Sequence, residues 1–345
     1  MSSSTSSSSR PRLGRLLLGL AGGLLLIGAG VAALGWQDAV EAGRRELEWR
    51  KPPRIDPVRA HPERPLLVFL GDSTFLPGHS YPRLIARWYG RRVETQILWW
   101  AGLEPFHHYL LSSRVAELDP TAVVIVAQTR IFWKREPLWY ADLMTQLPPS
   151  ELPRAMRLPF HARGVTLPRL ALASLLGTLP GSEELVFAWT GVRELARDLP
   201  AARWIVPAST PSTDPRNLQR HRLERFMRYA RPIRPGHPAL AALAATVERT
   251  VRGGARTLVL VSPVPVDRLS RAGLYDGAAF AEGVGAIARA VEGEGGELLD
   301  LHAILAEDDF TDQLGHMSES GTRKVATVVE PWLRKAIPKA GRGGR

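Results

Sequence analysis

A serine with the surroundings expected of a nucleophile follows a short apolar segment. Residues 66–70 are all hydrophobic and lead directly into Gly71, Asp72 and Ser73. This pattern places Ser73 just past the carboxyl end of a buried strand, the edge at which open α/β sheets bind ligands. Gly71 permits a tight turn, so the serine hydroxyl and backbone N–H can face one cleft. Ser73 is therefore a candidate nucleophile, although the same three residues also occur in ordinary strand-to-helix loops.

A histidine near the C-terminus could act as the base for such a nucleophile. His316 has Asp312 four residues before it, and a helix is expected to begin shortly after it. A serine hydrolase needs a base within hydrogen-bond reach of the serine and a group that orients this base. Ser73 and His316 thus form a candidate nucleophile–base pair, with Asp312 as the candidate acid.

The elements that must position these residues alternate along the chain. Short apolar segments predict buried strands at residues 66–70, 95–99, 122–127, 257–261 and 297–301. Helical patterns occupy residues 82–89, 109–118, 238–251, 280–291 and 321–336. This alternation predicts a mostly parallel α/β sheet. Continuous rather than alternating apolar residues in the strands favour a sheet that is covered on both faces.

Residues 131–236 interrupt the alternation. The segment is rich in proline and arginine, mostly helical in pattern, and has one possible strand at residues 204–207. We expect a helical insertion between two strands of the sheet. Within it, Leu223, Phe226 and Met227 form an apolar stripe that arginines flank. Such a helix either lies on an anionic membrane surface or packs its stripe on the protein core.

The N-terminal region has the pattern of a membrane anchor. Residues 1–12 form a serine-rich tail that we expect to be disordered, and residues 13–37 contain an uncharged span from 16 to 37. At about 1.5 Å per residue this span reaches about 33 Å, enough to cross a bilayer. The alternative is a signal peptide cleaved near residues 33–35. Residues 38–64 form a charged and then proline-rich linker, and arginines on both sides of the span leave its orientation open.

Composition restricts the other kinds of site. The net charge of +11 is carried almost wholly by arginine, and it either favours anionic partners or reflects a genome-wide preference for arginine codons. Residues 338–345 are a basic tail, but no nucleic-acid-binding motif is present. Because the chain has no cysteine, disulfides and thiolate chemistry are excluded. His107 and His108 are adjacent and point in different directions on a helix, which makes them a poor metal pair. We expect no metal, no cofactor and no nucleic acid.

The first and last of these segments resemble the SGNH, or GDSL, hydrolase superfamily. The first block of that family is Gly-Asp-Ser after the first strand, which Gly71, Asp72 and Ser73 match. The last block places an acid and a histidine before the final helix, as Asp312 and His316 do, with Gly321 in the family's H-x-x-x-x-G setting. The family acid stands three residues before the histidine, where this chain has glutamine. Asp312, Asp309 and Asp308 all remain candidates for it.

The resemblance also implies an oxyanion hole. The family has a glycine after its second strand, which Gly102 matches, and Gly-x-Asn after its third, where this chain has Ala127, Gln128 and Thr129. The implied donors are the backbone N–H groups of Ser73 and Gly102 with the amide of Gln128. The hydroxyl of Thr129 is the alternative to that amide.

Two residues just beyond the third strand are candidates for substrate binding. Because Arg130 and Trp133 come just after the third strand, we expect them on the rim of the active-site edge, where they either bind an anionic or carbohydrate substrate or form a solvated loop.

The resemblance implies a three-layer α/β/α flavodoxin-like domain over residues 65–337. The expected function is that of a membrane-anchored, extracytoplasmic serine esterase or O-acyltransferase, which works through an acyl-serine on esters of a cell-surface glycan or lipid. A polytopic membrane O-acyltransferase is the expected partner. The alternative is a catalytically inactive SGNH fold that serves as a scaffold or glycan-binding subunit.

Overall fold

The computed structural model describes residues 59–75, 80–99, 103–129, 143–163, 165–179, 233–311 and 315–337, with a few single residues elsewhere. Pro52–Thr178 and Ser212–Arg345 form one compact unit, and Met1–Lys51 and Leu179–Pro211 form another. The fold below is that of the first unit. The predicted strand at residues 204–207 and the basic helix around residues 220–231 lie outside the described residues, as does nearly all of the predicted anchor. No helix in the described part of the chain is long and apolar enough to span a membrane.

A five-stranded parallel sheet forms the centre of this unit. Its strands are β1 (Leu66–Gly71), β2 (Glu94–Trp99), β3 (Ala122–Ala127), β4 (Arg256–Val261) and β5 (Glu297–Asp300). They lie in the order β2-β1-β3-β4-β5, and every neighbouring pair is parallel. This is the strand order of flavodoxin-like sheets, which reverses between β1 and β3. The five predicted strands are confirmed, each to within one residue at either end.

Burial of the inner strands β1 and β3 explains why their apolar sequence pattern is continuous. All six residues of β1 and all six of β3 are buried, because helices cover both faces of the sheet. The edge strand β5 is more polar and ends in the exposed Glu297 and Asp300. A parallel sheet covered on both faces was expected from contiguous hydrophobic residues, and the structure has this arrangement.

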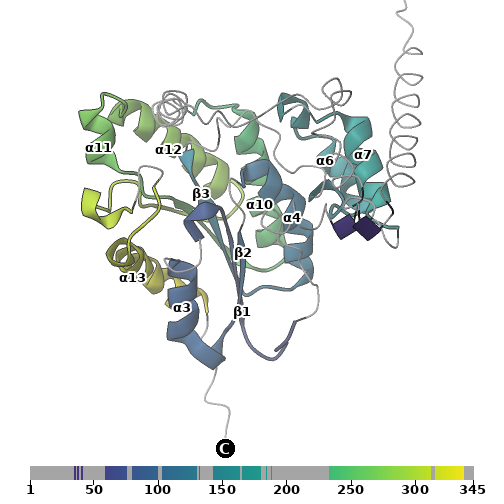
Figure 1. Ribbon diagram of the computed structural model, residues 1–345, viewed down its shortest axis with the longest axis horizontal. Helices are drawn as coiled ribbons and strands as arrows, with labels where there is room; N and C mark the ends of the chain where they lie inside the picture. The colour runs from purple at the N-terminus through teal and green to yellow at the C-terminus, as the bar shows by residue number, and fades with distance from the viewer. Residues whose placement is uncertain are drawn as a thin grey trace, which may run out of the picture. The chain divides into compact units, whose positions relative to one another are not determined.

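Helices form a layer on each face of the sheet (Figure 1). On one face, α4 (Pro105–Glu117), α10 (Pro238–Arg252) and α12 (Gly277–Glu292) share a core with Val68 and Ile125. On the other face, α3 (Tyr81–Tyr89) and α13 (Glu319–Ala336) pack around Phe69 and Val124. All five helices were predicted. The short helix α11 (Val266–Arg271) was not.

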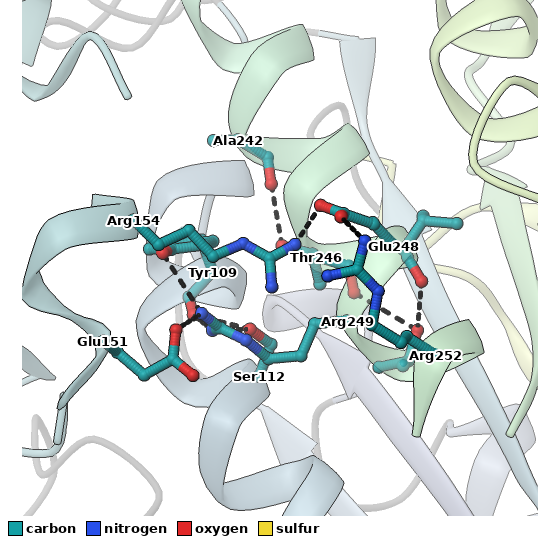
Figure 2. Close-up of polar contacts among 11 residues, drawn as sticks. Tyr109, Ser112, Glu151, Arg154, Ala242, Thr246, Glu248, Arg249 and Arg252 are labelled. Atoms are coloured by element: carbon teal, nitrogen blue, oxygen red, sulfur yellow. Dashed lines mark hydrogen bonds and ion pairs between the residues drawn. The ribbon is translucent and has the colours of Figure 1, made fainter. Parts of the chain in front are cut away.

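The described part of the predicted insertion is helical, and a buried arginine attaches it to the sheet domain. It contains the 3-10 turn η4 (Pro149–Glu151), α6 (Leu152–Ala155), the 3-10 turn η5 (Phe160–Arg163) and α7 (Leu167–Leu176). Arg249 of α10 is only 6% exposed. Its guanidinium donates to Ser112 Oγ at 2.6 Å and to the Tyr109 hydroxyl at 3.1 Å, both on α4. It also pairs with Glu151 of η4, as Figure 2 shows.

A second ion-pair cluster lies beside this one. Glu248 of α10 pairs with Arg154 of α6 and with Arg252 one turn along its own helix (Figure 2). The ring of Phe160 packs on Phe106 of α4, with the ring centroids 4.9 Å apart. Residues 149–160 are therefore held to α4 and α10 by charged and aromatic contacts together.

Candidate active site

Ser73 begins a tight turn at the carboxyl end of β1. The turn is the 3-10 segment η1 (Ser73–Phe75), in which Phe75 N donates to Asp72 O at 3.0 Å. A Cβ atom at Gly71 would lie 2.2 Å from the Phe75 ring, so only glycine allows this close approach. Phe75 itself packs edge-on against Tyr81, with the ring centroids 5.2 Å apart. The turn is thereby fixed under Ser73.

The structure brings Ser73 and His316 together. His316 Nε2 lies 3.1 Å from Ser73 Oγ, although 243 residues separate them in sequence. Both side chains are partly buried. The pair lies at the end of β1, next to the point where the strand order of the sheet reverses.

The backbone of His316 is held by a closed loop. Thr311 donates to the His316 carbonyl twice, from its backbone N at 2.8 Å and from its hydroxyl at 3.1 Å. Phe310 and Met317 form an antiparallel bridge just outside this pair. Gly315 has a φ of +89°, a left-handed conformation that favours glycine. These contacts fix the position from which the imidazole extends.

The start of α13 packs tightly behind the histidine. Ser318 caps the helix, because its hydroxyl accepts a hydrogen bond from Gly321 N at 3.3 Å. Ser318 N donates to Asp309 O at 2.7 Å. A Cβ atom at Gly321 would lie 2.4 Å from that same carbonyl oxygen. Glycine five residues after His316 is therefore a packing requirement of this loop.

Asp309 has a supporting position in the same loop. It is 3% exposed. One carboxylate oxygen accepts from Lys324 Nζ at 2.7 Å and from Ala306 N at 3.0 Å, and the other accepts from Ser320 Oγ at 2.7 Å. Burial acts to raise the pKa of Asp309, but the hydrogen bonds from Lys324 and Ser320 outweigh it and the pKa is lowered. The carboxylate thus joins the loop to α13.

Asp308 and Asp312 are the other two candidates for the acid that orients His316. Asp308 is exposed. Asp312 lies outside the described residues, as do Gly102, Arg130 and Trp133. Asp309 is engaged by three other donors.

Gln128 lies beside the nucleophile turn, and this contact was not foreseen. Its amide nitrogen donates to Asp72 Oδ1 at 3.2 Å. The same oxygen accepts from the backbone N and from the hydroxyl of Thr74, each at 2.9 Å. Asp72 is 2% exposed. The Asp-x-Thr spacing is a known turn pattern and could have indicated the bond to Thr74, but nothing local indicates the bond to Gln128.

The two adjacent histidines of α4 are buried. His107 Nδ1 accepts a hydrogen bond from Glu104 N at 3.1 Å and so caps the start of the helix. Burial lowers the pKa of His108 to about 4, so its imidazole is neutral at pH 7. Within the described residues no group of three or more histidine or acidic side chains could hold a metal ion.

A second polar cluster at the carboxyl edge was also missed. It follows β5, where His302 Nδ1 lies 2.8 Å from both carboxylate oxygens of Asp300. His302 Nε2 lies 3.2 Å from the hydroxyl of Tyr275. The signal in the sequence is Asp-x-His at a strand end, which alone does not reveal Tyr275 as the third member.

An open groove runs along the exposed side of α13. Ile304 lines it from the loop after β5, and Arg323, Lys324 and Val328 line it from the helix. Glu319, at the start of α13, also lines this groove. Neither Ser73 nor His316 is among its lining residues.

No family model and no curated protein matches this chain.

Proposed function

We propose that this protein is a serine esterase or O-acyltransferase of the SGNH type, with Ser73 as nucleophile and His316 as base. The observation that carries the proposal is the distance of 3.1 Å between His316 Nε2 and Ser73 Oγ. This is hydrogen-bond distance for an activated serine. The flavodoxin-like strand order supports the proposal further, because it places the pair where such sheets bind ligands.

The proposed reaction has two half-reactions. In the first, His316 Nε2 takes the proton from Ser73 Oγ as the oxygen attacks the acyl carbonyl carbon. The tetrahedral intermediate then collapses, and the alcohol leaves with the proton from His316. In the second, His316 deprotonates water or a sugar hydroxyl, whose oxygen attacks the acyl-serine. Ser73 leaves with that proton, and the enzyme is regenerated.

His316 must be neutral and must present its unprotonated Nε2 to Ser73. A carboxylate that accepts a hydrogen bond from Nδ1 fixes this tautomer and stabilises the imidazolium that forms. We assign this role to Asp312. The three hydrogen bonds that Asp309 accepts from Lys324, Ala306 and Ser320 support this choice.

The oxyanion requires donors at the carboxyl edge of the sheet. The backbone N–H groups of Ser73 and Gly102 are proposed for this role, with a side chain from the end of β3. Gln128 and Thr129 are the two residues at that position. Loss of one such donor costs about 10²–10³-fold in rate.

The proposal for the substrate rests on the family resemblance, and that for the location rests on the N-terminal sequence as well. The uncharged span at residues 16–37 supports a single N-terminal membrane anchor with an extracytoplasmic catalytic domain. We propose an acyl ester of a cell-surface glycan or lipid as substrate, with Arg130 and Trp133 on the rim of the site. A polytopic membrane O-acyltransferase is the proposed partner that supplies acyl groups.

A fluorophosphonate, which phosphonylates activated serines, tests the proposal. The full-length chain should be labelled, the Ser73→Ala variant should not, and Ser270→Ala should be labelled like the wild type. Ser270 is an exposed serine of α11 and serves as the matched control. A folded wild-type chain that takes no label would contradict the proposal and favour the inactive scaffold.

A further inference from the structure

One side of the helix α7 packs tightly on the rest of the domain. Leu170 is fully buried and belongs to the core under α4 and α10. Ser174 Oγ donates a hydrogen bond to Leu147 O at 2.5 Å. A Cβ atom at Gly177, just after the helix, would lie 1.9 Å from Thr145 O. These contacts fix which side of α7 faces the protein and which side faces outward.

The outward side of α7 is also apolar. Leu175 is 54% exposed, Leu167 is exposed as well, Leu176 is 39% exposed, and Leu172 is half-buried. At about 3.6 residues per turn these four leucines fall within one half of the helix circumference, and we call them the leucine face. A helix that is apolar all round is normally buried on every side. Because grouped, exposed apolar side chains mark interaction sites, the leucine face indicates a contact with a partner.

The segment that carries the leucine face is basic. Residues 149–178 contain four arginines and a single acidic residue, Glu151, and Glu151 is already paired with the buried Arg249. Arg157, two residues beyond α6, is exposed, and α6 packs against α7 (Figure 1). An apolar helix face in a basic surrounding is the combination that binds the interface of an anionic bilayer.

The chain also continues from α7 toward the proposed anchor. The uncharged span at residues 16–37 is long enough to cross a bilayer. Three residues after α7 the chain enters Leu179–Pro211, which belongs to the same compact unit as Met1–Lys51, the part that contains this span. A tether keeps a domain at a high effective concentration near the bilayer, so even a weak contact with the lipid surface forms.

We propose that the leucine face of α7 is a second membrane contact, which inserts into the headgroup region of an anionic bilayer while residues 16–37 span it. This placement rests on the proposed anchor and not on the chemistry of Ser73. The leucines enter the interface to a depth of about 5–10 Å. Since η4 is joined to α10 through Glu151 and Arg249, and η4 and α6 both pack on α7, this contact also sets the orientation of the sheet domain. It thereby determines the side from which a membrane-borne ester reaches Ser73.

The experiment uses a single fluorophore, which is possible because the chain has no cysteine of its own. The full-length Leu175→Cys variant is labelled with the fluorophore NBD and reconstituted into vesicles of phosphatidylglycerol and phosphatidylcholine. Part of the lipid carries a nitroxide in its upper acyl chain, which quenches NBD only at close range. The emission at residue 175 should fall about 2-fold or more relative to vesicles without nitroxide, because this position lies at the acyl boundary. Leu176→Cys should give the same result.

Val328→Cys is the matched control. Val328 is also an exposed aliphatic residue, but it lies on α13, which covers the other face of the sheet. Its fluorophore should not be quenched. In vesicles of phosphatidylcholine alone, quenching at residue 175 should be weaker, because the arginines lose their anionic partners. Equal quenching in the two kinds of vesicle would overturn the part of the proposal that requires anionic lipid.

The outcomes separate this inference from the proposed function. If the chain does not float with the vesicles, the proposed anchor fails and the role of the leucine face fails with it. If the chain floats but residue 175 is not quenched, only the role of the leucine face is overturned. A blue-shifted emission without quenching would also overturn it, because protein rather than lipid would then cover the leucines. Fluorophosphonate labelling of Ser73 in the same samples tests the catalytic proposal separately, and Leu175→Cys should be labelled like the wild type.

Discussion

Two histidines in the segment between β5 and α13 make nearly the same contact. His316 Nε2 lies 3.1 Å from the hydroxyl of Ser73, and His302 Nε2 lies 3.2 Å from the hydroxyl of Tyr275. His302 even has a carboxylate on its other nitrogen, because Asp300 lies 2.8 Å from Nδ1. By hydrogen-bond pattern alone, His302 looks at least as much like a catalytic base as His316 does.

The two sites differ in the hydroxyl and in its place on the sheet. Burial, followed by the charges of Asp300 and Asp276, raises the pKa of Tyr275, so its hydroxyl remains protonated. The rings of Phe280 and Tyr275 also pack against His302, with centroids 4.5 and 6.5 Å from its ring. The cluster follows the edge strand β5, whereas Ser73 lies where the strand order reverses. The position in the sheet topology, more than the hydrogen-bond pattern, distinguishes the candidate base His316 from His302, whose contacts connect two loops.

The largest expected difference is between the two histidines themselves. His316→Ala should lower fluorophosphonate labelling of Ser73 by about 10³-fold or more, because the serine loses its base. His302→Ala should leave the labelling rate within about 3-fold of wild type, since its contacts are structural. Equal losses of labelling in the two variants would contradict the assignment of His316 as the base and of His302 as a structural residue.

The next largest effect concerns the acid. Asp312→Asn should lower kcat about 10²–10⁴-fold, because His316 loses the carboxylate that fixes its tautomer. Asp309→Asn should lower kcat much less. Steady-state hydrolysis of p-nitrophenyl acetate by both variants gives the ranking. The reverse order would move the catalytic role to Asp309, and small equal losses would indicate a serine–histidine dyad.

Asp309→Asn should instead lower the free energy of unfolding, by about 1–3 kcal/mol, because a buried carboxylate loses charged hydrogen bonds. The pKa of Asp309 is lowered in the folded state. Its contribution is therefore present above the unfolded carboxyl pKa of about 3.9 and is lost as the pH falls through the folded value.

Urea unfolding at pH 7 and at pH 3 measures this effect. The difference from wild type should be smaller at the lower pH. Asp308→Asn makes the same change at the exposed neighbouring position and should have no effect at either pH.

The smallest effect is expected at the second histidine cluster. Tyr275→Phe keeps the ring contacts and removes the hydrogen bond to His302, which should cost about 1 kcal/mol of stability without changing activity. Burial and the charges of Asp300 and Asp276 raise the folded pKa of Tyr275, so the stability that depends on the protonated hydroxyl is present below the unfolded pKa of about 10 and is lost as the pH rises through the folded value.

Tyr89→Phe serves as the control for Tyr275→Phe. The Tyr89 hydroxyl is buried without a hydrogen-bond partner in the described structure, so its removal should cost nothing. Thermal unfolding at pH 7 compares the two variants. Equal losses of stability would show that the bond to His302 is not what Tyr275 contributes.

Most of the fold could be predicted because each strand carries its own signal. A segment such as residues 122–127 is uniformly apolar and is buried on both faces, so its burial can be read from six residues. The starts of two helices were predicted too late in the sequence. The pattern indicated 109 for α4 and 280 for α12, but the helices begin at Pro105 and Gly277. The first turn of α12 is made of small residues after the cap Asp276, and α4 begins with Pro105 after the cap Glu104, so capping residues rather than hydrophobic spacing set both starts.

The site was less predictable, because its contacts cross long stretches of sequence. Ser73 and His316 could be proposed as a pair from their residue types and neighbours. The contact of Gln128 with Asp72 spans 56 residues, and that of Tyr275 with His302 spans 27. Both depend on which strand ends and loops meet at the sheet edge. The three donors on Asp309 likewise require the fold of the loop before they can be identified.

The Arg249 cluster has a consequence for how this chain could be shortened. Arg249 contacts Ser112, which lies 137 residues before it in the sequence, and Glu151, which lies 98 residues before it. Deleting residues 143–178 would remove Glu151 together with the turn that carries it, whereas replacing Glu151 alone would leave a buried guanidinium without its carboxylate, which costs about 3–5 kcal/mol. That is a large part of the 5–15 kcal/mol that typically holds a domain folded. A shortened chain is therefore better made by removing the whole segment than by trimming it so that Glu151 alone is lost.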